Sequence, residues 1–336
     1  MINTLKKQWF VVLIALIFIG FAIFCIYDTN KGKLAGKSIS GKDVIASLDK
    51  DTNITADDLY TKLYDNYGYG ANALTRQFLN AVANESVEMT SDLEDKANKL
   101  KAQFQSAAEM YYSSYGYSSS DAYIEAMLLN YGFSADEINE FCITQVKMEK
   151  LQNDYIDKNF DTLFDSYFSA KKPRTVSHIL IKMEDPDNPT DEEQEKIDAI
   201  NKALKEGKDF AEVAKEYSDD TSSAENGGYL GLMDTDTSYV ESFMKAALKL
   251  SSNETSEWVK ESNDNYKGWH LIKTGDTTKE ELKNNKDIKD TLYTNIANNE
   301  SNITGTFMWE AAQKLNITYA DDNMKQSIMD TLGIKE

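Results

Sequence analysis

Residues 175–183 read TVSHILIKM, and this stretch decides the fold of the middle of the chain. Its apolar and polar residues alternate and β-branched residues are frequent, so it predicts a β-strand. It carries His178, one of the two histidines in the 336 residues. The other, His270, lies in a second apolar run, WHLI at 269–272, which also predicts a strand. Both histidines of the chain are therefore expected on strands.

Helices and further strands surround these two runs. Thr190 and Glu193 form a capping box, which predicts a helix that begins there and ends before Gly207. The predicted elements, in chain order, are a strand at 175–183, helices at 190–206 and 210–217, a strand at 227–233, a helix at 243–250, and strands near 258–259 and at 269–272. The order β-α-α-β-α-β-β predicts a compact α+β domain at residues 171–276.

The regions before and after this domain are predicted to be helical. Between residue 44 and about 170, helices are expected to begin at Thr55, at Thr90 or Ser91, and at Ser134, where Ser-Ala-Asp-Glu is a capping box. The third helix has an apolar stripe that includes Cys142, which we interpret as a small core residue. Residues 277–336 are helical again and are expected to pack on the N-terminal helices. The α+β domain is then an insertion in a split, all-helical domain.

Tyrosine is concentrated in the N-terminal helical region. Ten of the 19 tyrosines lie between Tyr60 and Tyr131, many of them in the clusters YDNYGYG at 64–70 and MYYSSYGYSSS at 110–120. In one interpretation these are loops whose rings pack on neighbouring helices. In the other they form an amphipathic surface that binds extended, partly unfolded chains, because tyrosine offers a large contact area at low entropic cost. The sequence favours the first interpretation and leaves the second open.

The N-terminus carries a run of 19 uncharged residues, WFVVLIALIFIGFAIFCIY at 9–27. The run is long enough to cross a bilayer as a helix, and no signal-peptide cleavage site stands out after it. The sequence predicts an uncleaved membrane anchor at 8–27, a cytoplasmic segment at 1–7 and a linker at 28–43. Lipid modification at Cys25 is the less favoured alternative, because the bulky Phe24 precedes it. Lysines flank the run on both sides, so charge does not decide its orientation.

Composition excludes several classes of protein. The chain has 56 acidic and 36 basic residues, and a net charge of −20 argues against non-specific nucleic-acid binding. Two cysteines, Cys25 and Cys142, cannot form a disulfide framework or a cysteine-rich zinc site. Two histidines leave little material for a histidine-based metal centre. We therefore expect no metal site and no nucleic-acid partner.

Residues 175–276 resemble a parvulin-type peptidyl-prolyl cis-trans isomerase domain. SHILIK at 177–182 and GWHLIK at 268–273 are similar to the opening and closing strands that carry the family's two active-site histidines. Three further motifs are similar in between: GKDFAEVAKEYSDD at 207–220, NGGYLG at 226–231 and the helix at 243–250. Five motifs in the family's order make this resemblance specific. It implies an enzyme that interconverts the cis and trans forms of Xaa-Pro bonds.

The resemblance also implies which residues form the site. His178, Asp220 and His270 occupy the catalytic positions, with Asp220 near the prolyl carbonyl. The proline-binding residues are expected to be Leu230, Met233, Tyr239 and Phe243, with Tyr239 at the rim of the pocket. The two histidines are expected to form a buried, hydrogen-bonded pair. That pair acts either as scaffold or directly in catalysis, and both interpretations stay open.

Such an enzyme needs no metal, cofactor or covalent intermediate. The barrier to rotation of about 20 kcal/mol comes from the partial double-bond character of the C–N bond, so a pocket that binds the twisted amide better than the planar one is sufficient. One departure from the family lies near the substrate groove: DTDTS at 234–238 replaces a Gly-Gln-Met-type loop. The pocket residues themselves are retained, so activity is expected.

The flanking regions are similar to the chaperone domains of PrsA- and SurA-type foldases. The similarity lies in the helix starts NITADDL at 53–59 and GFSADEI at 132–138 and in LNITY at 315–319. It implies a PrsA-like foldase of a Gram-positive cell membrane, with a single span and soluble domains outside the cytoplasm. Its partners would be unfolded or partly folded secreted proteins with Xaa-Pro bonds, and a homodimer is possible. The alternatives are a holdase chaperone whose parvulin domain is weakly active or inactive, and an inert surface or adhesion protein.

Overall fold

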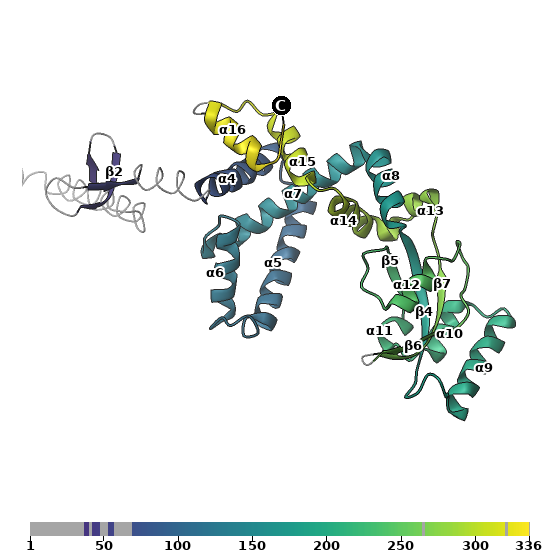
Figure 1. Ribbon diagram of the computed structural model, residues 1–336. Helices are drawn as coiled ribbons and strands as arrows, with labels where there is room; N and C mark the ends of the chain where they lie inside the picture. The colour runs from purple at the N-terminus through teal and green to yellow at the C-terminus, as the bar shows by residue number, and fades with distance from the viewer. Residues whose placement is uncertain are drawn as a thin grey trace, which may run out of the picture. The chain divides into compact units, whose positions relative to one another are not determined.

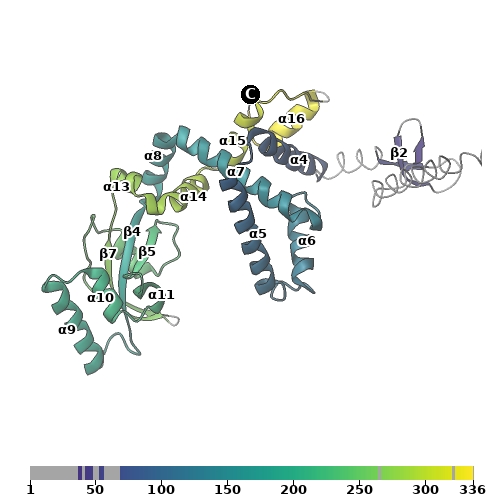
Figure 2. The same cartoon turned by 180° about the vertical axis from the view of Figure 1, so that it is seen from behind.

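The computed structural model describes residues 37–39, 42–47, 53–56, 69–263, 266–319 and 322–335, and Figures 1 and 2 show it from opposite sides. The chain divides into two compact units, residues 1–77 and 78–336. The anchor expected at 8–27, its Cys25 and most of the linker at 28–43 lie outside the described residues. Among the helices that are described, none has the length and apolar character needed to cross a membrane.

The first unit contains a three-stranded antiparallel sheet of order β1-β2-β3. Its strands are β1 (Lys37–Ile39), β2 (Lys42–Ser47) and β3 (Asn53–Thr55). The prediction of helix from residue 44 onward is wrong for residues 44–47 and 53–55, which are strands, with Val44 paired to Thr55. Thr55 ends β3 and the next residue, Ala56, is helical, in agreement with the helix start predicted at Thr55. The β-branched Ile45 and Ile54 favour extended backbone, and the two residues between β1 and β2 are the usual length of a hairpin connection.

The second unit begins within α4 (Tyr69–Ser86), which crosses the boundary between the two units. The helices that follow are α5 (Ser91–Tyr111), α6 (Ser120–Asn130), the short 3₁₀ helix η1 (Ala135–Glu137), α7 (Ile138–Lys158) and α8 (Phe160–Lys171). Helix α5 packs against α6 and α7. Cys142 of α7 is 1% exposed within the core between them, so its interpretation as a core residue is confirmed.

Helix starts in this region follow local capping rules. The Thr90 side chain accepts a hydrogen bond from the Leu93 backbone and begins α5, as predicted. Ser134 and Glu137 form the predicted capping box, although the first turn is η1 and the α-helix proper begins at Ile138. Only residues three positions apart are needed for these bonds, which is why the sequence alone could locate both helix starts.

The α+β region is built on a four-stranded antiparallel sheet of order β5-β4-β7-β6. Its elements are β4 (Arg174–Lys182), α9 (Asp191–Lys205), α10 (Phe210–Tyr217), α11 (Thr221–Ala224), β5 (Tyr229–Met233), α12 (Glu241–Ala247), β6 (Val259–Asn263) and β7 (Tyr266–Thr274). The predicted order of elements is confirmed, and the four-residue α11 is an addition to it. Strands β4 and β7, which carry the two histidines, are neighbours at the centre of the sheet.

The two faces of this sheet carry different cores. Ile179 and Ile181 of β4 pack with α9 and α10, together with Leu271 of β7. On the other face, Val176 of β4 and Ile272 of β7 pack with Phe243 and Ala247 of α12. Successive side chains of a strand point to opposite faces. The face that packs on α12 is therefore the one that receives His178 and His270.

The chain returns to helices after β7: α13 (Lys279–Asn284), the 3₁₀ helix η2 (Lys286–Ile288), α14 (Lys289–Asn299), α15 (Ile303–Ala312) and α16 (Asp322–Thr331). Helix α14 contacts α7 and α8, and α15 contacts α7. The two connections to the sheet are hydrogen-bonded to each other, because the Thr175 backbone donates to Asp276 and accepts from Gly275. The chain thus enters the sheet region and leaves it at neighbouring points, near Thr175 and Gly275.

Candidate functional site

The two histidines meet across the central strand pair. In the register of β4 and β7, His178 lies opposite Ile272 and His270 lies opposite Leu180. The histidines are therefore diagonal neighbours on one face, within reach of each other's rings. Their Nδ1 atoms lie 3.2 Å apart and their ring planes are only 18° from parallel. Both side chains are buried, at 4% and 3% exposure.

A glycine allows the backbone to approach this pair. The His178 backbone N–H donates to the Gly228 carbonyl at 2.8 Å. A Cβ at Gly228 would lie 2.1 Å from the carbonyl oxygen of His178, and the residue has a φ of +75°. Only glycine accepts both conditions without strain. The NGG motif at 226–228 thus brings the start of β5 against the strand that carries His178.

Asp220 extends the pair into a chain of three polar side chains. Its Oδ2 lies 2.8 Å from Nε2 of His178. The Ser222 and Ser223 hydroxyls also donate to this carboxylate, each at 2.5 Å, and the Ser222 backbone donates to it as the first turn of α11 begins. If His178 donates from Nε2, its Nδ1 accepts, and the proton between the two rings belongs to His270. Both rings are then neutral.

The pKa values agree with a neutral pair beside an ionised acid. Burial lowers the pKa of His178, although Asp220 raises it in part. Burial and the neighbouring His178 lower the pKa of His270 to about 4. Burial alone raises the pKa of Asp220, but hydrogen bonds from Ser222, Ser223 and His178 outweigh it and hold this pKa well below its ordinary value. At neutral pH the site carries one negative charge, on Asp220.

An apolar surface adjoins these polar groups. The Phe243 ring lies edge-on to both imidazoles, with centroid distances of 5.9 Å to His178 and 5.5 Å to His270. The Tyr239 ring lies 5.1 Å from Phe243. The four expected proline-binding residues, Leu230, Met233, Tyr239 and Phe243, belong to one apolar cluster. The structure therefore brings the seven residues singled out by the sequence into one connected group, in which His178 contacts both Asp220 and Phe243.

The four apolar residues differ in how accessible they are. Met233 is fully buried and Phe243 is 3% exposed, whereas Leu230 and Tyr239 are only partly buried. Leu230 lies where the register between β4 and β5 shifts, since Val176 pairs with Gly231 and Ser177 with Tyr229. Such a bulge redirects a side chain relative to the regular pleat. Leu230 and Tyr239 are thus the accessible members of the cluster, and the buried Met233 packs within it.

Sequence reasoning missed three residues that position the site. Arg174 is 7% exposed, and its guanidinium donates to the carbonyls of Ala247 and Leu250 at the end of α12, the helix that carries Phe243. No local pattern indicates this contact, because it joins residues more than 70 positions apart. Ser222 and Ser223 could have been found, since an Asp followed by small hydroxyl residues is a typical helix start.

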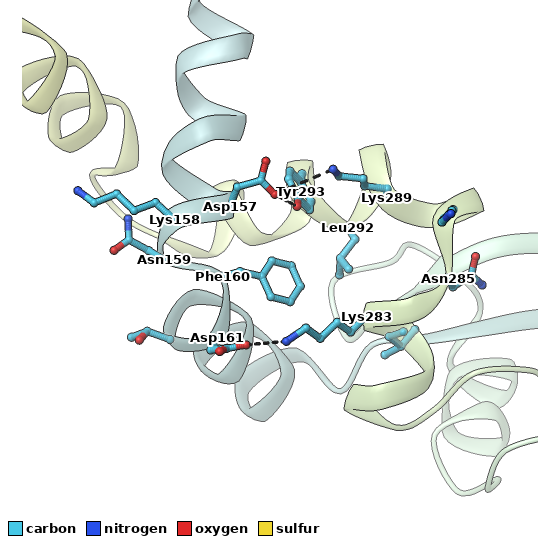
Figure 3. Close-up of a pocket in the computed structure, with 13 residues that line it drawn as sticks. Asp157, Lys158, Asn159, Phe160, Asp161, Lys283, Asn285, Lys289, Leu292 and Tyr293 are labelled. Atoms are coloured by element: carbon cyan, nitrogen blue, oxygen red, sulfur yellow. Dashed lines mark hydrogen bonds and ion pairs between the residues drawn. The ribbon is translucent and has the colours of Figure 1, made fainter.

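A separate cavity of about 620 Å³ lies in the helical region, between the α7–α8 junction and residues 282–293 (Figure 3). None of the seven site residues lines it. Lys283 pairs with Asp161, and its ammonium group lies 5.5 Å from the centre of the Phe160 ring. The Tyr293 hydroxyl donates to Asp157. The charged groups that Figure 3 joins by dashed lines are thus already paired with each other.

The arrangement supplies an ionised carboxylate beside an apolar surface, held by a neutral imidazole pair. The part of the chain that is described contains no cluster of His, Cys, Asp and Glu side chains able to hold a metal ion. The seven residues do not form the nucleophile, base and orienting group of a hydrolase. His178 is hydrogen-bonded to Asp220, and the Ser223 hydroxyl donates to the same carboxylate. The geometry suits non-covalent binding of an apolar residue next to a polar backbone.

Comparison with known families and sequences gives a consistent result. Residues 167–278 match the PPIC-type PPIASE domain. The foldase protein PrsA of Clostridium botulinum (strain Langeland) is 30% identical over 216 residues, which cover 61% of this chain and 56% of that protein. The foldase protein PrsA of Clostridium acetobutylicum is 26% identical over 263 residues, covering 73% and 74%. The chain thus spans little more than half the length of the first of these relatives.

Solved structures of proteins with the same name are also similar to this chain. The crystal structure of PrsA from Bacillus subtilis is 26% identical, with a TM-score of 0.44, and the match covers 85% of this chain and 98% of that one. The structure of foldase protein PrsA from Streptococcus pneumoniae is 19% identical, with a TM-score of 0.48 and coverage of 86% and 99%.

Proposed function

From the match of residues 167–278 to the PPIC-type PPIASE domain, we propose that the chain catalyses cis-trans isomerisation of Xaa-Pro bonds in proteins that it helps to fold. The observation that carries the proposal is the position of the ionised Asp220 beside the apolar cluster of Phe243, Tyr239 and Leu230. The apolar cluster suits the prolyl ring, and the carboxylate then lies near the backbone that precedes the proline.

The charge on Asp220 has a physical consequence for a bound amide. In a planar peptide bond, resonance moves negative charge onto the carbonyl oxygen, and rotation about C–N removes that resonance. A carboxylate close to the carbonyl oxygen disfavours the planar form more than the twisted one. The difference lowers the barrier without a covalent step, because only interactions that are better in the transition state accelerate the reaction.

We assign the histidine pair to positioning rather than to proton transfer. Rotation about an amide C–N bond requires no proton transfer. The lowered pKa values of His178 and His270 keep both rings neutral at physiological pH. A neutral His178 that donates from Nε2 holds Asp220 in one orientation. His270 in turn fixes the tautomer of His178 through the Nδ1 contact.

A matched pair of substitutions tests the proposal. Phe243→Leu alters the predicted proline-binding cluster, whereas Phe210→Leu removes an equally buried ring from the opposite face of the sheet. Loss of ring contacts with the prolyl group should lower kcat/KM for an Xaa-Pro peptide by about tenfold in Phe243→Leu. Phe210→Leu should lower stability and leave the rate unchanged while the protein is folded. Equal rates in the two variants would refute the proposed site.

A second function, binding of unfolded chains as a holdase, is favoured by a separate observation. The large apolar side chains that stand exposed in the described residues all lie between positions 89 and 131, with exposures from 39% to 68%: Met89, Met110, Tyr111, Tyr115, Leu129 and Tyr131. Met110, Tyr111 and Tyr115 lie at the turn between α5 and α6, and Met89, Leu129 and Tyr131 lie at the opposite ends of these two helices. The exposed apolar groups at the turn are typical of an interaction surface. The hypothesis that tyrosines here bind extended chains therefore remains a proposal beside the enzymatic one.

We further propose the organisation and location that follow from these functions. Residues 78–170 and 277–336 would form one chaperone-like domain with the isomerase domain at 171–276 inserted in it, while residues 44–77 fall in the separate first unit. The contacts of α14 with α7 and α8, and of α15 with α7, support this division. The apolar run at 9–27 would anchor the chain as a single span in the cell membrane, with the soluble domains outside. The clients are then secreted proteins that contain Xaa-Pro bonds.

A further inference from the structure

The loop between β5 and α12 is held by helices that lie outside the isomerase sheet. This loop, residues 234–238, is also where the sequence departs from the parvulin pattern. Its first residue, Asp234, is 6% exposed, and its Oδ2 accepts a hydrogen bond from the Tyr167 hydroxyl of α8 at 2.7 Å. Asn295 of α14 donates to the same oxygen at 3.3 Å and to the Tyr167 hydroxyl at 3.1 Å. We call Tyr167, Asp234 and Asn295 the junction triad.

The three members of the junction triad come from three different elements; the Tyr167–Asp234 bond is buried and the two bonds of Asn295 are partly buried. Tyr167 is 1% exposed, and burial together with the bond to Asp234 raises its pKa, so the phenol stays a hydrogen-bond donor. A second contact runs beside it, because the Thr235 backbone donates to the Lys171 carbonyl and the Lys171 ammonium group pairs with Asp236. A buried acceptor that loses its donor is costly, so the loop and the two helices are held in one arrangement.

Hydrogen bonds within the loop continue from the junction triad to the substrate site. The Asp234 backbone N–H donates to Oγ1 of Thr237, and the Asp236 N–H donates to Oδ1 of Asp234. The Tyr239 N–H then donates to the Thr237 carbonyl at 2.9 Å. The Tyr239 ring lies on Phe243, at the accessible edge of the apolar cluster. These bonds connect Asp234 to Tyr239, five residues later, at the rim of the proposed proline-binding surface.

We propose that Tyr167 and Asn295 are positioning residues for substrate binding, and that through Asp234 they fix Tyr239 at the rim of the isomerase site. The helices that frame the chain, rather than the isomerase sheet alone, then set the affinity for the residues around the proline. This proposal rests on the proposed isomerase function. It assigns no chemical step to the junction triad, since Asp220 and the histidine pair belong to a separate set of hydrogen bonds.

The experiment compares Tyr167→Phe and Asn295→Ala with a matched control, Tyr293→Phe, in the full chain. Tyr293 lies on α14 like Asn295 and also donates to a carboxylate, but its hydroxyl bonds to Asp157 of α7 rather than to Asp234 of the loop. Steady-state isomerisation of a peptide with one Xaa-Pro bond gives kcat and KM. Loss of one buried hydrogen bond at the junction triad should raise KM by about fivefold with kcat unchanged. Tyr293→Phe should leave both values unchanged.

Two further measurements keep the proposal separate from the proposed function. Dissociation constants of a fluorescent Xaa-Pro peptide, measured by anisotropy, report on Tyr239 even if the wild-type chain proves inactive, an outcome that would refute only the isomerase function. Asp234→Asn keeps one acceptor for Tyr167 and should weaken peptide binding less than Asp234→Ala does. The proposal is wrong if Tyr167→Phe and Asn295→Ala change KM and peptide affinity no more than Tyr293→Phe does. It is also wrong if they lower kcat alone.

Discussion

At the scale of single residues, the site depends on which groups carry charge. Asp220 is held ionised by hydroxyl donors and by His178, and the two imidazoles are held neutral by burial. Neutral, buried histidines at the centre of a sheet reduce the free energy of unfolding only when the solution becomes acidic. The unfolded chain can then bind protons that the folded chain cannot.

The folded protein should therefore lose stability between pH 7 and pH 5 through His270. Its pKa is about 4 when folded, below the ordinary value of 6.5, so its contribution is present above pH 6.5 and is lost as the pH falls toward 4. The loss attributable to this one group is about 2 kcal/mol between pH 7 and pH 5. It is measured as the change in denaturant midpoint, compared with His270→Gln.

The substitution His270→Gln removes the titrating group, so the midpoint of that variant should fall less over the same pH interval. Titrating groups away from the histidine pair affect both proteins equally, so the difference between the two pH dependences reports on His270 and on its effect on the adjacent His178. Parallel pH dependences of the wild type and the variant would contradict the neutral, buried state assigned to this histidine.

At the scale of elements, local hydrogen-bond patterns could be predicted from the sequence, whereas contacts between distant residues could not. The capping residues Thr90, Ser134 and Thr190 located three helix starts, because each bond joins residues three positions apart. The prediction of helix before Thr55 failed, since residues 44–47 and 53–55 pair as strands and no local pattern shows that pairing. The seven candidate site residues were proposed through motif resemblance. Arg174 and the junction triad were not, because their partners lie 61 to 128 residues away in the sequence.

The α5–α6 hairpin supports a prediction at this scale. If its exposed apolar side chains bind unfolded chains, Met110→Ser with Tyr115→Ser should reduce suppression of aggregation of a denatured client. Both residues are more than 60% exposed, so their replacement should leave the free energy of unfolding within about 0.5 kcal/mol of the wild type. The matched control is Tyr217→Ser, a partly buried tyrosine of the isomerase domain. Undiminished suppression by the double variant would exclude this surface.

At the scale of the whole molecule, side-chain contacts join the helices to the isomerase sheet in addition to the two chain connections. The junction triad and the Lys171–Asp236 pair bind the 234–238 loop to α8 and α14. The sequence indicated that this loop departs from the family pattern, but its acidic residues gave no sign of a partner 67 positions earlier. In physical terms, a buried hydrogen bond between elements depends on the packing of the complete fold.

The proposed catalysis requires an ionised Asp220. The most direct measurement is the exchange between cis and trans resonances of an Xaa-Pro peptide, recorded by NMR with catalytic amounts of the full chain. The wild type should accelerate exchange. Asp220→Asn, which keeps the helix cap but removes the charge, should slow the catalysed rate by about tenfold or more. An Asp220→Asn protein that exchanges the peptide as fast as the wild type would contradict the central claim.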